Sequence, residues 1–67
     1  MNQSWVKIYT SQQFIKAEIV RQVLIEHGID AVLLNKQDSS YKFGFVEVHI
    51  HPQNFDQAIE IIIQNEL

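Results

Sequence analysis

Hydrophobic and polar positions divide the first half of this chain into a strand and a helix. Residues 5–9 are mostly β-branched or aromatic and alternate with a period of two, which predicts a strand. Residues 12–27 place apolar side chains at helical spacing, and Gly28 follows as a residue type that commonly ends a helix. Phe14 and Ile25 fall on the exposed side of this predicted helix. We expect its broad buried face to carry Ile15, Ala17, Ile19, Val20, Val23 and Leu24.

The second half of the chain shows two further strands and a final helix. Residues 29–35 are almost continuously apolar and residues 43–50 alternate, so each predicts a strand. The polar segment 36–42 between them predicts a hairpin loop longer than the minimal turn. Pro52 ends the third strand, and a helix is expected to begin near Asn54. Its predicted buried stripe is formed by Phe55, Ala58, Ile59 and Ile62, widened by Ile61 and Ile63.

The order of these elements predicts an α+β fold in a single domain, residues 1–67. A right-handed crossover makes the first two strands parallel, and the third strand lies between them, antiparallel to both. The arrangement is a truncated ferredoxin-like β-α-β-β-α fold, with strand order 1-3-2 and both helices on one face of the sheet. We expect the final ferredoxin-like strand to be missing, so that residues 5–10 form an exposed edge where a second chain or a peptide can add.

Composition narrows the classes of protein that this fold can represent. The chain has 67 residues, of which 46% are hydrophobic, no cysteine, and a net charge of -3. The missing cysteines exclude a disulfide framework and a thiolate metal site. The charges are scattered, which is not the pattern of proteins that bind duplex nucleic acid or anionic lipid. The longest apolar run, Ala31 to Leu34, is far shorter than the roughly 20 residues of a membrane helix, so we expect a cytoplasmic protein.

The face of the sheet without helices is the most informative predicted surface. Contiguous apolar patches of this kind usually mark an interface. Three interpretations stay open: these side chains pack among themselves, they form a surface for self-association or a protein partner, or they bind a small ligand. Strict alternation places on this face Trp5, Lys7 and Tyr9 from the first strand, Val32 and Leu34 from the second, and Phe43, Phe45, Glu47 and His49 from the third.

A further interpretation of this face, besides these three, is the binding of single-stranded nucleic acid. The segment 43–48, Phe-Gly-Phe-Val-Glu-Val, resembles the second half of the octapeptide of the RNA-recognition motif, whose aromatic residues stack on bases. Trp5 and Tyr9 are expected on the neighbouring strand. The acidic net charge, and Lys7 where that motif has an aromatic residue, argue against nucleic acid as the main partner.

Metal binding and catalysis have weaker support in the sequence. His49 and His51 share one face of a strand and are a weak pair of metal candidates, because no third or fourth ligand can be named. The Asp-Ser-Ser segment 38–40 predicts a turn, not a catalytic group. We therefore expect no enzyme activity, no metal and no cofactor.

The hairpin loop is the remaining candidate for a ligand contact. Three residues that flank it carry a cationic or hydroxyl group, and loops on rigid scaffolds often carry function. If the loop contacts an anionic ligand or partner, we expect the contact to be made by Lys36, Tyr41 and Lys42.

Several segments together resemble a family of small bacterial domains, the putative prokaryotic signal-transducing proteins. These segments are residues 6–10, residues 15–20, residues 24–29 with the exit His-Gly-Ile, Ala31, and residues 52–61 with Pro-x-x-Phe-Asp-x-Ala-Ile-Glu-Ile. The resemblance implies a GlnB-like, that is PII-like, fold and a regulatory role. We expect a regulatory or protein-interaction module that acts by binding, and the alternative is a module that binds single-stranded nucleic acid or a small anion on the open sheet face.

Overall fold

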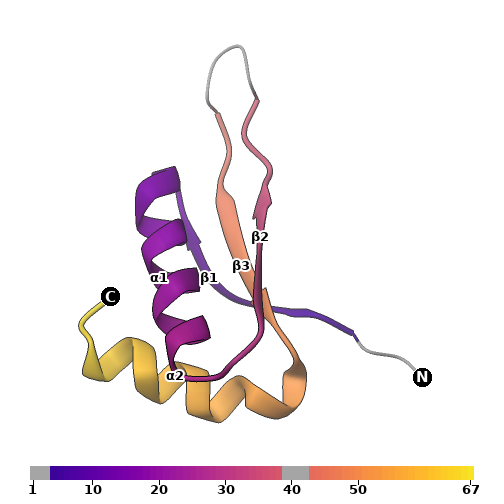
Figure 1. The fold of residues 1–67 in the computed structure, drawn as a ribbon. Helices are drawn as coiled ribbons and strands as arrows, with labels where there is room; N and C mark the ends of the chain where they lie inside the picture. Colours follow the sequence, from indigo (N-terminus) through magenta and orange to yellow (C-terminus); the bar gives the residue numbers. More distant parts are fainter. Residues whose placement is uncertain (1–3, 39–42) are drawn as a thin grey trace.

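The computed structural model describes residues 4–38 and 43–67. Ser39, Ser40 and the candidate ligand residues Tyr41 and Lys42 lie outside the described residues. The strand β3 lies between β1 and β2 and is antiparallel to both (Figure 1). The predicted α+β fold and its strand order are therefore confirmed. The elements are β1 (Val6–Ser11), α1 (Phe14–Glu26), β2 (Ala31–Asn35), β3 (Val46–Ile50), the short 3-10 helix η1 (Pro52–Asn54) and α2 (Phe55–Gln64).

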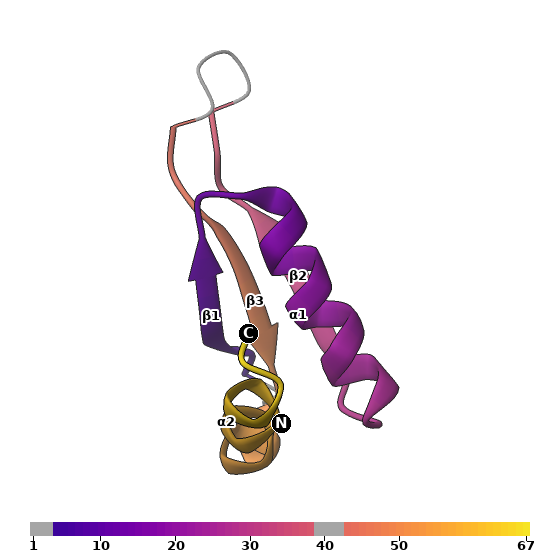
Figure 2. The ribbon, with the colours of Figure 1, turned by 90° about the vertical axis from the view of Figure 1, so that its left-hand side faces the viewer.

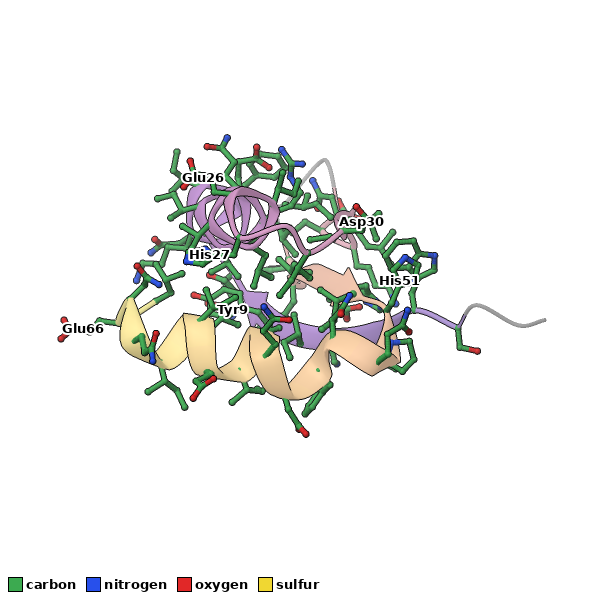
Figure 3. All side chains as sticks on the ribbon, turned by 60° about the horizontal axis from the view of Figure 1, so that its bottom comes forward. Tyr9, Glu26, His27, Asp30, His51 and Glu66 are labelled. Atoms are coloured by element: carbon green, nitrogen blue, oxygen red, sulfur yellow. The ribbon has the colours of Figure 1, made fainter. Side chains whose placement is uncertain are left out.

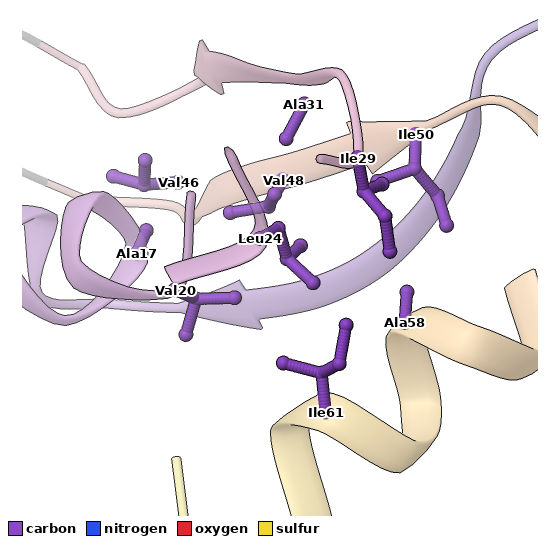
Figure 4. Packing of buried hydrophobic residues seen from close by; sticks show 10 residues of the cluster. All are labelled: Ala17, Val20, Leu24, Ile29, Ala31, Val46, Val48, Ile50, Ala58 and Ile61. Atoms are coloured by element: carbon purple, nitrogen blue, oxygen red, sulfur yellow. The ribbon is translucent and has the colours of Figure 1, made fainter. Parts of the chain in front are cut away.

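Both helices pack on one face of the sheet, and the hydrophobic core lies between the two layers. The helix α1 lies along the strands, whereas α2 crosses near one end of this layer (Figures 1 and 2). Neither helix in the described part of the chain is long and apolar enough to span a membrane. The buried side chains come from all main elements except β1 (Figure 4): Ala17, Val20, Leu24, Ile29, Ala31, Val46, Val48, Ile50, Ala58 and Ile61.

The end of α1 positions β2 through a glycine in the left-handed region. Gly28 has a φ of +83°, and its amide donates to the carbonyl of Ile25 at 2.9 Å. The amide of Ile29 donates to the carbonyl of Leu24 at 3.0 Å, which completes a Schellman motif. Leu24 and Ile29 are both buried, so the chain leaves the helix and enters the core at once. The predicted role of Gly28 is confirmed.

The buried stripe of each helix is narrower than the sequence predicts. Ile15 and Ile19 were expected in the core, but they are 65% and 45% exposed. The reason is geometric: α2 crosses the layer near one end instead of lying alongside α1, so it does not cover the whole length of α1. In α2, Phe55 and Ile63 are also exposed, and the buried contacts are made by Ala58 and Ile61.

A β-bulge interrupts the alternation of β1. Lys7 lies opposite His49 on β3, but Tyr9 lies opposite Val48, so Ile8 is an extra residue in β1. Ile8 and Tyr9 are both half-buried and pack against the core. Because one inserted residue moves every following side chain to the other face, the second half of β1 is reversed relative to strict alternation.

The bulge overturns the prediction that Tyr9 lies on the face without helices. Tyr9 lies on the same side of the sheet as the buried Val48, and Figure 3 shows it in the region between the two helices. Thr10, opposite Glu47, takes the place on the uncovered face that was expected for Tyr9. A bulge is set by pairing with another strand, so the sequence of β1 alone does not reveal it.

Candidate functional site

The candidate site is the face of the sheet that carries no helix in the described residues, called here the open face. Its rows run across all the strands: Lys7, His49 and Val32 are in register, and so are Thr10, Glu47 and Leu34. The members of the open face are Trp5, Lys7, Thr10, Asp30, Val32, Leu34, Lys36, Phe45, Glu47, His49 and His51.

Glu47 lies at the centre of the open face. Its carboxylate contacts a side chain of its own strand β3, a side chain of β1, and a side chain just past the end of β2. His49 Nε2 lies 2.9 Å from Glu47 Oε1. The Nζ atom of Lys36 lies 3.5 Å from the same oxygen, and the Nζ atom of Lys7 lies 3.8 Å from Oε2. The side chains of Glu47 and His49 are only 13% and 15% exposed, whereas the two lysine side chains are 54% and 61% exposed. We call these four residues the Glu47 cluster.

The Glu47 cluster keeps its carboxylate ionised. The hydrogen bond with His49 is the largest effect and lowers the pKa of Glu47 below its ordinary value of 4.5. Burial opposes it, and the positive charges of Lys36 and Lys7 lower the pKa further. Two lysines contact one carboxylate, so the centre of the open face has a net positive charge although the whole chain has a net charge of -3. Each lysine ammonium also keeps donors that Glu47 does not use.

Lys36 belongs to the open face and not only to the hairpin loop where the sequence placed it. Its amide donates to the carbonyl of Phe45 at 3.0 Å, so the pairing of β2 with β3 continues past the end of the assigned strands. Gly44, next to Phe45, has a φ of +100° and approaches the carbonyl of Lys36 closely. This close pairing brings the Lys36 side chain to Glu47.

A second row of side chains crosses the end of the open face. The ring of Trp5 stacks on His51, with centroids 4.1 Å apart and an angle of 27° between the planes. On the other side, His51 Nε2 lies 3.8 Å from Asp30 Oδ2, and Figure 3 shows these two residues close together. Trp5 is therefore held against the sheet and is still 41% exposed.

The two histidines do not form a shared metal site in this geometry. His49 contacts Glu47, whereas His51 lies between Trp5 and Asp30. Within residues 4–38 and 43–67, no group of three or more His, Cys, Asp or Glu side chains is placed to hold a metal ion.

Most of the residues that the sequence predicted for this surface lie together on the open face. Three groups of predicted residues do not. Tyr9 faces the helices, as described above, and Tyr41 and Lys42 lie outside the described residues. Phe43 is 72% exposed and lies on the outer arm of the hairpin, beyond Gly44. The predicted residues that do share the open face are Trp5, Lys7, Val32, Leu34, Phe45, Glu47 and His49, and Lys36 joins them.

A pocket on the helix side was not foreseen from the sequence. It has a volume of about 280 Å³ and combines apolar walls with a lysine, a phenol and a carboxylate. No pattern in the sequence indicates this pocket, because the bulge that turns Tyr9 toward the helices depends on strand pairing. The lining residues are Tyr9, Lys16, Ile19, Val20, Glu66 and Leu67.

The helix α1 also carries an ion pair away from both sites. Arg21 donates to Glu18 through Nε at 2.9 Å and through Nη2 at 2.6 Å, and Gln22 donates to the same carboxylate at 2.8 Å. These hydrogen bonds lower the pKa of Glu18 to about 2. Because all three residues lie on one helix, the pair stabilises α1 locally.

Comparison with known protein families identifies the family of this chain. The model of the family described as "Putative prokaryotic signal transducing protein" matches residues 5–66. The chain belongs to this family. The match runs from Trp5 to the end of α2, so it covers the whole open face, and the resemblance inferred from the sequence is confirmed. Comparison of the chain with curated proteins and with solved structures gave no match.

Proposed function

We propose that this chain is a small regulatory module that binds a protein partner on its open face and takes part in signal transduction without catalysis. The observation that carries the proposal is the uncovered sheet face itself, with apolar side chains around the Glu47 cluster. In keeping with the prokaryotic family, the proposed setting is the bacterial cytoplasm.

The composition of the open face suits a protein interface. Trp5, Leu34 and Phe45 are between 41% and 48% exposed, so each can bury further area against a partner. Large aromatic side chains surrounded by polar groups are typical of the residues that contribute most binding energy. Lys7 and Lys36 lie on two sides of the cluster, where their free donors can meet carboxylates of a partner.

The geometry of the Glu47 cluster favours binding over catalysis. The carboxylate is already engaged by His49, Lys36 and Lys7, and its pKa is lowered, whereas a general acid or base works best with a pKa near the working pH. A carboxylate held ionised in this way positions the lysines around it, which is a role in recognition.

The test compares aromatic residues of equal exposure on opposite faces. Phe45 on the open face is 48% exposed and Phe14 at the start of α1 is 49% exposed. The tagged chain is used to isolate partners from its own organism, and each candidate is purified and titrated against the wild type and the two variants. We expect F45A to weaken binding by about tenfold or more, as for an interface anchor, and F14A to leave it unchanged. Equal affinities of F45A and the wild type, or an equal loss in F14A, would contradict the proposal.

A second candidate function is the binding of single-stranded nucleic acid or a small anion on the same face. It is supported by the exposed ammonium groups of Lys7 and Lys36 near the aromatic rings of Trp5 and Phe45. It is weakened by Tyr9, which faces the helices and offers no stacking surface there. The fluorescence of Trp5, the single tryptophan, reports binding directly during titration with oligonucleotides and a nucleotide panel. No change at low salt would exclude this candidate.

A further inference from the structure

The two edges of the sheet differ in how well they can accept another strand. The edge strand β1 contains the bulge at Ile8 and the charged Lys7, and both features hinder pairing with a further strand. The other edge strand, β2, pairs with β3 in regular register over all five residues and reads Ala-Val-Leu-Leu-Asn, without charge, proline or glycine. Although the sequence pointed to the first strand, β2 is the edge with fewer obstacles to pairing.

The hydrogen bonds of the hairpin show which backbone groups of β2 point outward. The amide of Lys36 donates to Phe45 at 3.0 Å, so residue 36 forms a hydrogen-bonded pair with β3. In an antiparallel ladder such pairs recur at every second residue, so Val32 and Leu34 also direct their backbone groups toward β3. The amides and carbonyls that point away from the sheet are therefore those of Ala31, Leu33 and Asn35. In the described residues no strand pairs with this row.

A second copy of β2 can pair with this row in a symmetric way. In a two-fold antiparallel pair centred on Leu33, that residue lies opposite itself and Ala31 lies opposite Asn35, so every outward group meets another. The same register places Asp30 of one copy opposite Lys36 of the other, once at each end. Asp30 is 84% exposed at its side chain and Lys36 is 61% exposed, so both can reach a partner.

Only this register combines complete pairing with complementary charge. Both charged side chains lie on the open face, because Asp30 contacts His51 there and Lys36 contacts Glu47. A pair centred on Leu34 would place Asp30 opposite Asp38, which is repulsive. A register centred on Val32 would separate Asp30 from Lys36 and leave Asn35 opposite a residue before β2.

We propose that the chain forms a symmetric dimer in which β2 pairs antiparallel with β2 of a second copy, with Leu33 at the two-fold axis and an Asp30–Lys36 ion pair at each end. The inference goes beyond the proposed function and does not depend on it, since it rests on the outward backbone groups of β2 and on the pairing of Asp30 with Lys36 of a second copy, and not on a protein partner. The paired edges form a small interface, so the dimer is weak and appears at micromolar concentration or above. It joins the two open faces into one continuous surface.

The charge pairing is tested by sedimentation of a concentration series of the wild type, D30K, K36D and the double variant D30K/K36D. We expect each single variant to raise the dimer dissociation constant by about fivefold or more, because two ion pairs become two repulsive contacts. The double variant restores opposite charges and should return to within about twofold of the wild type. K7D is the matched control for K36D, because each variant removes one lysine contact with Glu47. Lys7 lies on the β1 edge, so K7D should leave the dimer unchanged.

The backbone pairing is tested at Asn35, whose amide points outward. N35P removes this donor, whereas N35A keeps it, and both variants lose the side-chain acceptor for the amide of Gln37 at 2.9 Å. We expect N35A to dimerise like the wild type and N35P to weaken the dimer at least tenfold, with circular dichroism showing that both are folded.

Three results would overturn the proposal: a wild-type chain that stays monomeric at millimolar concentration, a dimer that D30K and K36D leave unchanged, or a double variant that is not restored. If N35P does not fold, the charge series decides alone. The variant F45A separates this proposal from the proposed function, because it should lose the protein partner and still dimerise.

Discussion

The two glycines of the chain allow a direct measurement of how tightly the hairpin is paired. Both have a positive φ, +83° at Gly28 and +100° at Gly44, so alanine at either position suffers a similar conformational cost of about 1–2 kcal/mol. A Cβ atom at Gly28 would meet no atom within 4 Å. At Gly44 it would lie 2.8 Å from the carbonyl oxygen of Lys36, which is backbone and can yield only if the two arms separate. We expect a total loss of about 3 kcal/mol or more for G44A.

The assay is thermal unfolding of the wild type, G28A and G44A, followed by far-ultraviolet circular dichroism. For a domain of this size, each kcal/mol lowers the Tm by about 4–8 °C, so G28A should lose about 4–16 °C and G44A clearly more. A second readout is the pKa of Glu47, measured by NMR. It should rise in G44A, because the charge of Lys36 moves away although the hydrogen bond with His49 remains, and it should stay unchanged in G28A.

One result would refute this reasoning. If G44A loses no more stability than G28A, the carbonyl of Lys36 does not constrain the hairpin in solution. The position of Lys36 beside Glu47 would then not depend on the close approach at Gly44.

Two further predictions concern the electrostatics and the bulge. Because the pKa of Glu47 is lowered in the folded chain, its stabilising effect is present above the ordinary value of 4.5 and lost as the pH falls through the lowered value, so E47Q should lose less stability than the wild type as the pH falls below about 4.5. Identical acid profiles in urea unfolding would contradict this. Tyr9→Ala should cost about 1–3 kcal/mol, because the ring packs against the core, whereas Thr10→Ala should stay within about 0.5 kcal/mol. Equal losses in the two variants would place Tyr9 outside the core.

The sequence alone was sufficient for the order of elements and for the family. Periods of two and 3.6 residues are local properties, so they marked each strand and helix to within a few residues. The end of α1 was predicted equally well, because Gly28 acts through its own φ and the hydrogen bonds of its neighbours. Trp5, Glu47 and His49 were placed on the correct face because no irregularity separates them from the regular register.

Helix faces and edges were harder to predict. Ile15 and Ile19 follow the helical period, but whether they are buried depends on where α2 crosses, which is a property of the assembled layer. The choice between β1 and β2 as the pairing edge depends on a bulge that forms only when β1 meets β3.

The side chains that make up the open face were determined in part by the sequence and in part by the tertiary structure. Alternation within β3 determined that Glu47 and His49 share a face, because that relation needs only the chain's own geometry. Only the tertiary structure decided that Tyr9 leaves this face and that Lys36 joins it, because each depends on a partner strand distant in the sequence. Local periodicity specifies the elements, whereas the pairing between them decides which side chains meet.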